Sequence, residues 1–244
     1  MRDELTRRSV LKGACGVVAG AALNGAALSG VQGLSAVAAT SHDDKAPQNA
    51  ITPTVALHRL MDGNARYTRN QSVVKDYSAG RAARATAQYP VAAILGCADA
   101  RVSPELVFDQ GPGDLFVTRV AGNYMNTDNL ASLEYAVELL HAPLVMVLGH
   151  TNCGAVSAVV KNAKKNEPLP GHIYLLVDAV QPGVAQAIKQ GGDNVLVHAV
   201  EENVRHNVER LRRAQPLLTQ HLAKKTIDVV GAVYDLDTGQ VRLL

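Results

Sequence analysis

The sequence predicts an α/β fold: a mostly parallel central sheet flanked by helices, with N-terminal helical arms and a C-terminal antiparallel edge hairpin. Three short apolar runs, at residues 91–95, 115–120 and 144–148, are separated by segments of helical pattern. Continuous apolar strands that alternate with helices are typical of a parallel sheet covered on both faces. Near the C-terminus, two further apolar runs flank Asp237-Thr238-Gly239, a turn of the Asp/Gly type that favours a hairpin.

The first expected elements are two helices ahead of the sheet. Threonine often caps the start of a helix and proline is often its first residue, so Thr52 and Pro53 predict a helix from residue 53 to about residue 69. A second helix is expected from Ser78 to near Gln88. Both are expected to be amphipathic arms.

The remaining elements follow in alternation. After the strand at 91–95 we expect a helix start at Ser103-Pro104-Glu105, the strand at 115–120, a helix over 128–141 and the strand at 144–148. A helix to about residue 166 and an apolar stretch after residue 171 come next. The segment 193–213 has helical spacing of Leu196, Val200, Val204, Val208 and Leu211, which we interpret as core packing. Strands at 229–234 and 241–244 form the hairpin.

Residues 1–39 are predicted to be a twin-arginine (Tat) export signal. Arg7-Arg8 precedes a weakly apolar stretch that ends in a small-residue cleavage site near residue 38 or 39. Asn24 and Gln32 make this stretch too polar for a stable membrane anchor. We therefore expect a periplasmic or secreted protein that engages the Tat translocon, with a linker at 40–52 and one domain at 53–244.

The charge of the chain excludes one class of partner. Four of the 24 basic and two of the 22 acidic residues lie in residues 1–39, which leaves 20 of each. No basic stripe is interleaved with aromatic residues, so no nucleic-acid partner is expected. The rest of the chain has a formal charge of zero, so its net charge says nothing about a partner.

Cys97, His150 and Cys153 form a candidate metal site. Cys97 and His150 follow predicted parallel strands, whose carboxyl ends meet at one edge of the sheet. Three such ligands beside Asp99 indicate a catalytic zinc whose fourth position can open to water. The alternative is a Cys97–Cys153 disulfide, since these are the only thiols after the signal. We favour zinc because the Tat route exports folded protein and because a disulfide gives His150 no role.

Several motifs in order resemble the β-class carbonic anhydrases. They are Cys97-x-Asp99-x-Arg101, Gly113-Asp114-Leu115-Phe116-Val117-Thr118-Arg119, Ala121-Gly122-Asn123, Glu134-Tyr135-Ala136-Val137 and Gly149-His150-x-x-Cys153-Gly154. The likeness extends over nearly all of the chain that follows the signal. The resemblance implies reversible hydration of carbon dioxide to bicarbonate and a proton by a zinc-bound hydroxide.

The resemblance also implies the role of each site residue. Cys97, His150 and Cys153 would bind Zn²⁺. Asp99 would either occupy the fourth zinc position, in a closed state, or pair with Arg101 and leave room for water. The catalytic residues would be Asp99 and Arg101.

The substrate side of the site is implied in the same way. Gln88 matches the family's amide donor, Phe116 and Tyr135 match its pocket wall, and Gly154 belongs to the ligand motif. In this family the wall is shared across a dimer interface. We therefore expect a homo-oligomer, a dimer or a tetramer.

The chain departs from the family's common pattern at several positions. Ala98 and Ala100 replace two serines, and Val120 replaces an asparagine, which removes hydrogen bonds near the metal. Because the chain has no Trp, we expect no regulatory bicarbonate site at Arg119. The alternatives left open are a carbonyl sulfide or carbon disulfide hydrolase and a noncatalytic zinc-binding module. Arg101 argues against the module, because a closed structural site has no use for it.

Overall fold

The computed structural model describes residues 47–78, 80–165 and 170–244. Residues 45–244 form one compact unit, which contains the whole sheet. The expected export signal at 1–39 lies outside the described residues. No helix in the described segments is long and apolar enough to cross a membrane.

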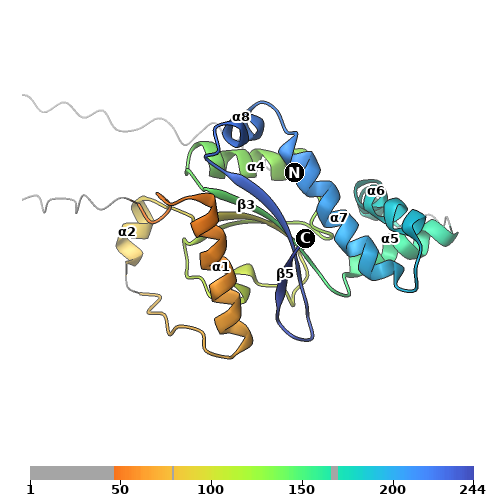
Figure 1. Ribbon diagram of the computed structural model, residues 1–244, viewed down its shortest axis with the longest axis horizontal. Coiled ribbons are helices and arrows are strands. Elements are labelled where there is room, and N and C mark those ends of the chain that lie inside the picture. The colour runs from red at the N-terminus through yellow and green to blue at the C-terminus, as the bar shows by residue number, and fades with distance from the viewer. Residues whose placement is uncertain (1–46, 79, 166–169) are drawn as a thin grey trace, which may run out of the picture. The chain divides into compact units, whose positions relative to one another are not determined.

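A single five-stranded sheet forms the centre of this unit, with strand order β2-β1-β3-β4-β5 (Figure 1). The strands are β1 (Ala92–Gly96), β2 (Leu115–Arg119), β3 (Leu144–His150), β4 (Asp228–Tyr234) and β5 (Val241–Leu243). The first four are parallel and β5 pairs antiparallel with β4 at the edge. The predicted fold class and edge hairpin are confirmed.

Most helices fall close to their expected ranges, but the stretch after residue 171 proves to be a helix and the helix at Leu217–Ala223 was not expected. They are α1 (Pro53–Thr68), α2 (Arg81–Thr86), α3 (Pro104–Val107), α4 (Thr127–Glu138), α5 (Gly154–Lys165), α6 (Tyr174–Gln190), α7 (Val195–Arg212) and α8 (Leu217–Ala223), with a 3₁₀ turn at Gly171–Ile173 before α6. The helix expected at 128–141 ends early, at Glu138, and His141 beyond it adopts a left-handed φ of 57°. The expected second arm is shorter than predicted and buries no residue, so α2 adds nothing to the core of this chain.

Two apolar layers cover the two faces of the sheet. On one face, Ala93 and Leu95 of β1 pack with α4, α7 and α8, while on the other face Ala92 and Ile94 pack with α1 and α3 (Figure 1). Every residue of β1 and β3 is buried, which explains the continuous apolar runs. The first helix therefore belongs to the core through Leu60, which is fully buried.

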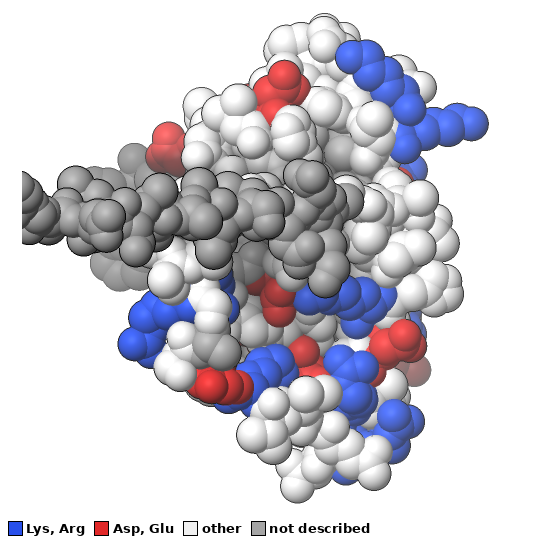
Figure 2. Space-filling view, turned by 90° about the vertical axis from the view of Figure 1, so that its left-hand side faces the viewer, with Lys and Arg blue, Asp and Glu red and all other residues white. Residues whose placement is uncertain are grey.

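Charged side chains are mixed on the surface. Figure 2 shows one face on which Lys and Arg lie among Asp and Glu. The ion pairs include Arg66 and Lys75, which both contact the buried carboxylate of Asp109. The charged residues that are visible on this face therefore carry both signs.

Candidate metal centre

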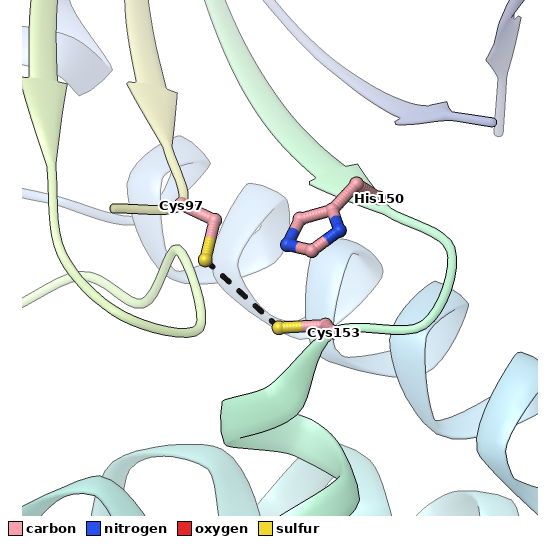
Figure 3. Close-up of side chains that lie close together, drawn as sticks. All are labelled: Cys97, His150 and Cys153. Atoms are coloured by element: carbon pink, nitrogen blue, oxygen red, sulfur yellow. Dashed lines mark hydrogen bonds between the residues drawn. The ribbon is translucent and has the colours of Figure 1, made fainter. Parts of the chain in front are cut away.

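Cys97, His150 and Cys153 meet at the carboxyl edge of the sheet. Cys97 follows β1, His150 ends β3, and Cys153 directly precedes α5 (Figure 3). The chain turns between the last two through Asn152, whose φ of 52° is left-handed. The expected position of the site at the strand ends is confirmed.

The three side chains present their ligand atoms to one another. These atoms all lie within 4.8 Å of one another, and none of the three residues is more than 3% exposed. The two sulfurs are 3.9 Å apart and both cysteines are free. A disulfide bond would need about 2.05 Å between the sulfurs. The geometry is therefore that of a ligand group rather than a disulfide.

The imidazole of His150 has one nitrogen left for a metal. Its Nδ1 lies 2.9 Å from the carbonyl oxygen of Thr151, and its Nε2 is buried without a hydrogen-bond partner. When Nδ1 carries the proton and donates to this carbonyl, Nε2 presents a lone pair. A buried, unsatisfied nitrogen beside two sulfurs fits a soft, tetrahedral cation such as Zn²⁺.

The two thiols are electrostatically unequal. Hydrogen bonds lower the pKa of Cys97 to about 4 against the opposing effect of burial; the bond from the Cys153 thiol is the largest cause, and contacts from His150 and backbone N–H groups add to it. The same contact and burial raise the pKa of Cys153, although two backbone N–H groups at the start of α5 favour its thiolate. The pair thus holds one proton that a divalent cation would displace.

Asp99 and Arg101 form a bidentate ion pair beside this group. Arg101 Nε and Nη2 donate to the two carboxylate oxygens of Asp99 at 2.9 and 2.7 Å, and the Arg101 backbone N–H donates at 2.9 Å. These hydrogen bonds hold the pKa of Asp99 well below its usual range. Oδ2 of Asp99 lies 3.7 Å from Nε2 of His150. An ionised carboxylate therefore faces the metal ligands.

The four expected substrate-side residues lie in two places. Gly154 is exposed at the start of α5, beside Cys153, and a Cβ built on it would meet no atom within 4 Å. Phe116 pairs with Ala93, four residues before Cys97 on β1, and therefore lies about 13 Å from the level of the metal ligands.

The other two expected residues accompany Phe116. The Tyr135 ring centroid is 6.1 Å from that of Phe116, and Tyr135 lines an open depression of about 690 Å³ together with Gln88. Within one chain, Gln88, Phe116 and Tyr135 thus gather together but apart from the metal ligands.

Comparisons with known proteins agree with this geometry. A family model described as carbonic anhydrase matches residues 92–241. The carbonic anhydrase of Mycolicibacterium smegmatis is 38% identical over 78% of this chain and 93% of its own length. The chain belongs to the β-class carbonic anhydrase family.

Solved structures of this family share the fold. A β-carbonic anhydrase of Coccomyxa, in complex with acetazolamide, has a TM-score of 0.61 at 30% identity, over 77% of this chain and 86% of that one. A tetrameric β-carbonic anhydrase of Sordaria macrospora has a TM-score of 0.62 at 18% identity, over 78% of this chain and 97% of that one. The central sheet and its helices are those of β-class carbonic anhydrases.

Arg119 supports the metal centre of this carbonic anhydrase in a way that the sequence did not predict. Its Nε donates to the carbonyl oxygen of Cys97 at 2.9 Å, and its Nη2 donates to that of Asp99 at 2.6 Å. The guanidinium therefore holds the backbone on either side of Ala98. Its position at the end of β2, beside the end of β1, was the available signal.

Proposed function

We propose that this chain catalyses the reversible hydration of carbon dioxide to bicarbonate and a proton, with Zn²⁺ held by Cys97, His150 and Cys153. The observation that carries the proposal is the buried Cys-His-Cys group, with its unsatisfied Nε2, beside an ionised carboxylate. Three protein ligands leave a fourth position, as in catalytic rather than structural zinc sites. Zinc in such a site supplies a Lewis acid that makes water a nucleophile at neutral pH.

Asp99 and Arg101 would orient the reacting water. The ionised carboxylate of Asp99 accepts a hydrogen bond from this water and directs a lone pair of its oxygen towards the carbon of carbon dioxide. Arg101 keeps that carboxylate in place through two parallel hydrogen bonds. One proton of the water leaves to solvent, and the remaining hydroxyl becomes part of bicarbonate.

We also propose that a second copy of the chain covers the depression lined by Gln88. Tyr89, Tyr135 and Leu139 are 46%, 45% and 62% exposed on this side of the molecule. Exposed aromatic and aliphatic side chains around an open depression are typical of an interface. In a dimer or tetramer, Gln88, Phe116 and Tyr135 would then complete the site of the partner.

The oligomer is tested by placing a charge in this surface. Leu139→Asp should give a monomer with reduced activity, measured by light scattering and carbon dioxide hydration. Ile188→Asp is the matched control, because Ile188 is a 44% exposed aliphatic residue near the end of α6. A Leu139→Asp protein that stays oligomeric and active would contradict the proposed interface.

Residues 1–39 are further proposed to export the protein through the Tat translocon, to the periplasm or outside the cell. The support is Arg7-Arg8 ahead of a weakly apolar stretch. Replacing both arginines by lysine should retain the protein in the cytoplasm, as seen by cell fractionation. Unchanged export of this variant would contradict the proposed route.

The catalytic proposal is tested with the wild type, Asp99→Ala and Cys97→Ser. Zinc content and carbon dioxide hydration are measured for each. Asp99→Ala should retain zinc and lose about 10–100-fold in activity, since it removes a partner that orients the reacting group. Cys97→Ser should lose zinc. If the zinc-loaded wild type hydrolyses carbonyl sulfide but does not hydrate carbon dioxide, the proposed substrate is wrong and carbonyl sulfide takes its place.

A further inference from the structure

Three polar side chains on one face of α7 hold the loop at residues 122–125. They are Asn203, Asn207 and Arg210, which follow one another along the helix. Asn203 Nδ2 donates to the carbonyl oxygen of Gly122 at 2.8 Å. Oδ1 of Asn207 accepts from the Met125 N–H at 2.8 Å, and Arg210 Nη1 donates to the Met125 carbonyl at 2.9 Å.

The same loop contacts a metal ligand. The Gly122 N–H donates to Sγ of Cys97 at 3.3 Å, while the carbonyl of Gly122 accepts from Asn203. Gly122 has a φ of 86°, and a Cβ there would lie 3.1 Å from Val180 and 3.3 Å from Ala155. One glycine thus connects the sulfur to α7, at a positive φ that favours glycine and in a space where a side chain would be tightly packed.

Burial makes the contact between Asn203 and Gly122 specific. Asn203 and Asn207 are 1% and 0% exposed, although both occur in the interior of a helix, which disfavours asparagine. A buried amide without hydrogen-bond partners is costly. Here Asn207 Nδ2 donates to the side-chain Oδ1 of Asn203 at 3.3 Å and to the backbone carbonyl oxygen of Asn203 at 2.8 Å. The amide of Asn203 is therefore fixed by its neighbour.

The backbone at Asn203 is fixed from the other side by α6. A Cβ added to Gly183 would lie 2.6 Å from Cα of Asn203 and 2.7 Å from its nitrogen, so the two helices are in direct backbone contact. The backbone of Asn203 cannot move away from Gly122 without breaking this packing.

We propose that Asn203 is a positioning residue for the metal centre and acts through Gly122. By holding the Gly122 carbonyl, it keeps the N–H of the same residue directed at the sulfur of Cys97. A hydrogen bond to a ligand sulfur draws charge from it and fixes its orientation, and partners of this kind tune the affinity of a site for its metal. The inference rests on the proposed function only in taking Cys97, His150 and Cys153 as metal ligands.

The experiment compares Asn203→Ala with the wild type in the full chain. Equilibrium competition with a chelator of known zinc affinity gives the metal affinity, and the sulfur-to-cobalt charge-transfer band of the Co²⁺-substituted protein gives the state of the ligand sulfur. Asn203→Ala should lower the affinity for zinc about 10–100-fold and shift this band. Both readouts are independent of carbon dioxide hydration, so a failure of the proposed activity would leave this test intact.

The matched control is Asn64→Ala. Asn64 is also buried, at 4% exposed, and joins three backbone groups, the carbonyls of Val107 and Gly239 and the N–H of Val241. None of these groups belongs to the metal site, so this variant should lose stability and keep the wild-type zinc affinity and cobalt band.

Equal zinc affinity and equal cobalt bands in Asn203→Ala and Asn64→Ala would overturn the proposal. If Asn203→Ala does not fold, Asn207→Ala replaces it, because that variant leaves Asn203 in place but removes the donor that orients it. A smaller change in the same direction would support the proposal. A wild-type cobalt band and zinc affinity in Asn207→Ala would overturn it.

Discussion

Gly149 lies on the core strand β3 directly before the ligand His150, and a single methyl group added to it should disturb both the packing of the strand and the position of the ligand. A Cβ at this position would lie 2.6 Å from Cγ2 of Val204 and 3.5 Å from Cγ1 of Val200, both on α7. Carbon atoms pack at about 3.5–4.0 Å, so α7 or the strand must move by about 1 Å. Such overpacking typically costs about 1–3 kcal/mol. We predict that Gly149→Ala loses this much unfolding free energy and binds zinc less tightly.

The assay is a double-mutant cycle, in which urea unfolding of the zinc-loaded protein gives the free energy of unfolding of each variant. Val204→Ala removes the methyl group that clashes and should by itself cost about 2 kcal/mol, because Val204 is fully buried. In the double variant the new methyl group occupies part of the vacated space. The two changes should then be coupled favourably by about 0.5–3 kcal/mol. Additive losses would refute the contact between Gly149 and Val204.

Three further predictions concern the metal centre and the surface of α7. Chelation of the metal in air should let Cys97 and Cys153 form a disulfide, since their sulfurs are 3.9 Å apart; two free thiols in the peptide map would contradict this. Arg119→Ala should lower activity about 10–100-fold, because it releases two carbonyls of the metal loop; unchanged turnover and zinc affinity would contradict the role of this clamp. Burial and the nearby Arg210 lower the pKa of His206. As the pH falls below about 6.5, the unfolded chain therefore binds a proton that the folded chain resists, and stability decreases. His206→Gln should reduce this decrease between pH 7 and 5.5 in urea unfolding, and an identical decrease would contradict it.

The sheet could be predicted because its strands are buried on both faces. Such strands appear as apolar runs, and the observed β1 and β3 differ from the predicted runs only at their ends. The helix α8 was not predicted because it has seven residues and buries only Leu218. The second arm was predicted too long, since α2 buries no residue that could stabilise a longer helix.

The metal ligands could be predicted because each lies at a strand end or a helix start. The local sequence is enough to locate such ends along the chain. The supports of the site could not, because they come from elements that are distant in sequence. Asn203 contacts Gly122 across 81 positions, and no local pattern indicates that pairing. The signal for this contact in the sequence was the pair Asn203 and Asn207 within a helix that otherwise has an apolar face. It was overlooked because the apolar spacing of α7 was interpreted as core packing alone.

Carbon dioxide hydration by the purified, zinc-analysed chain decides whether the Cys-His-Cys group is a catalytic zinc site. We predict one zinc per chain and hydration activity that disappears, together with the metal, in Cys97→Ser. A wild-type protein that carries zinc but does not hydrate carbon dioxide from neutral to alkaline pH would contradict it.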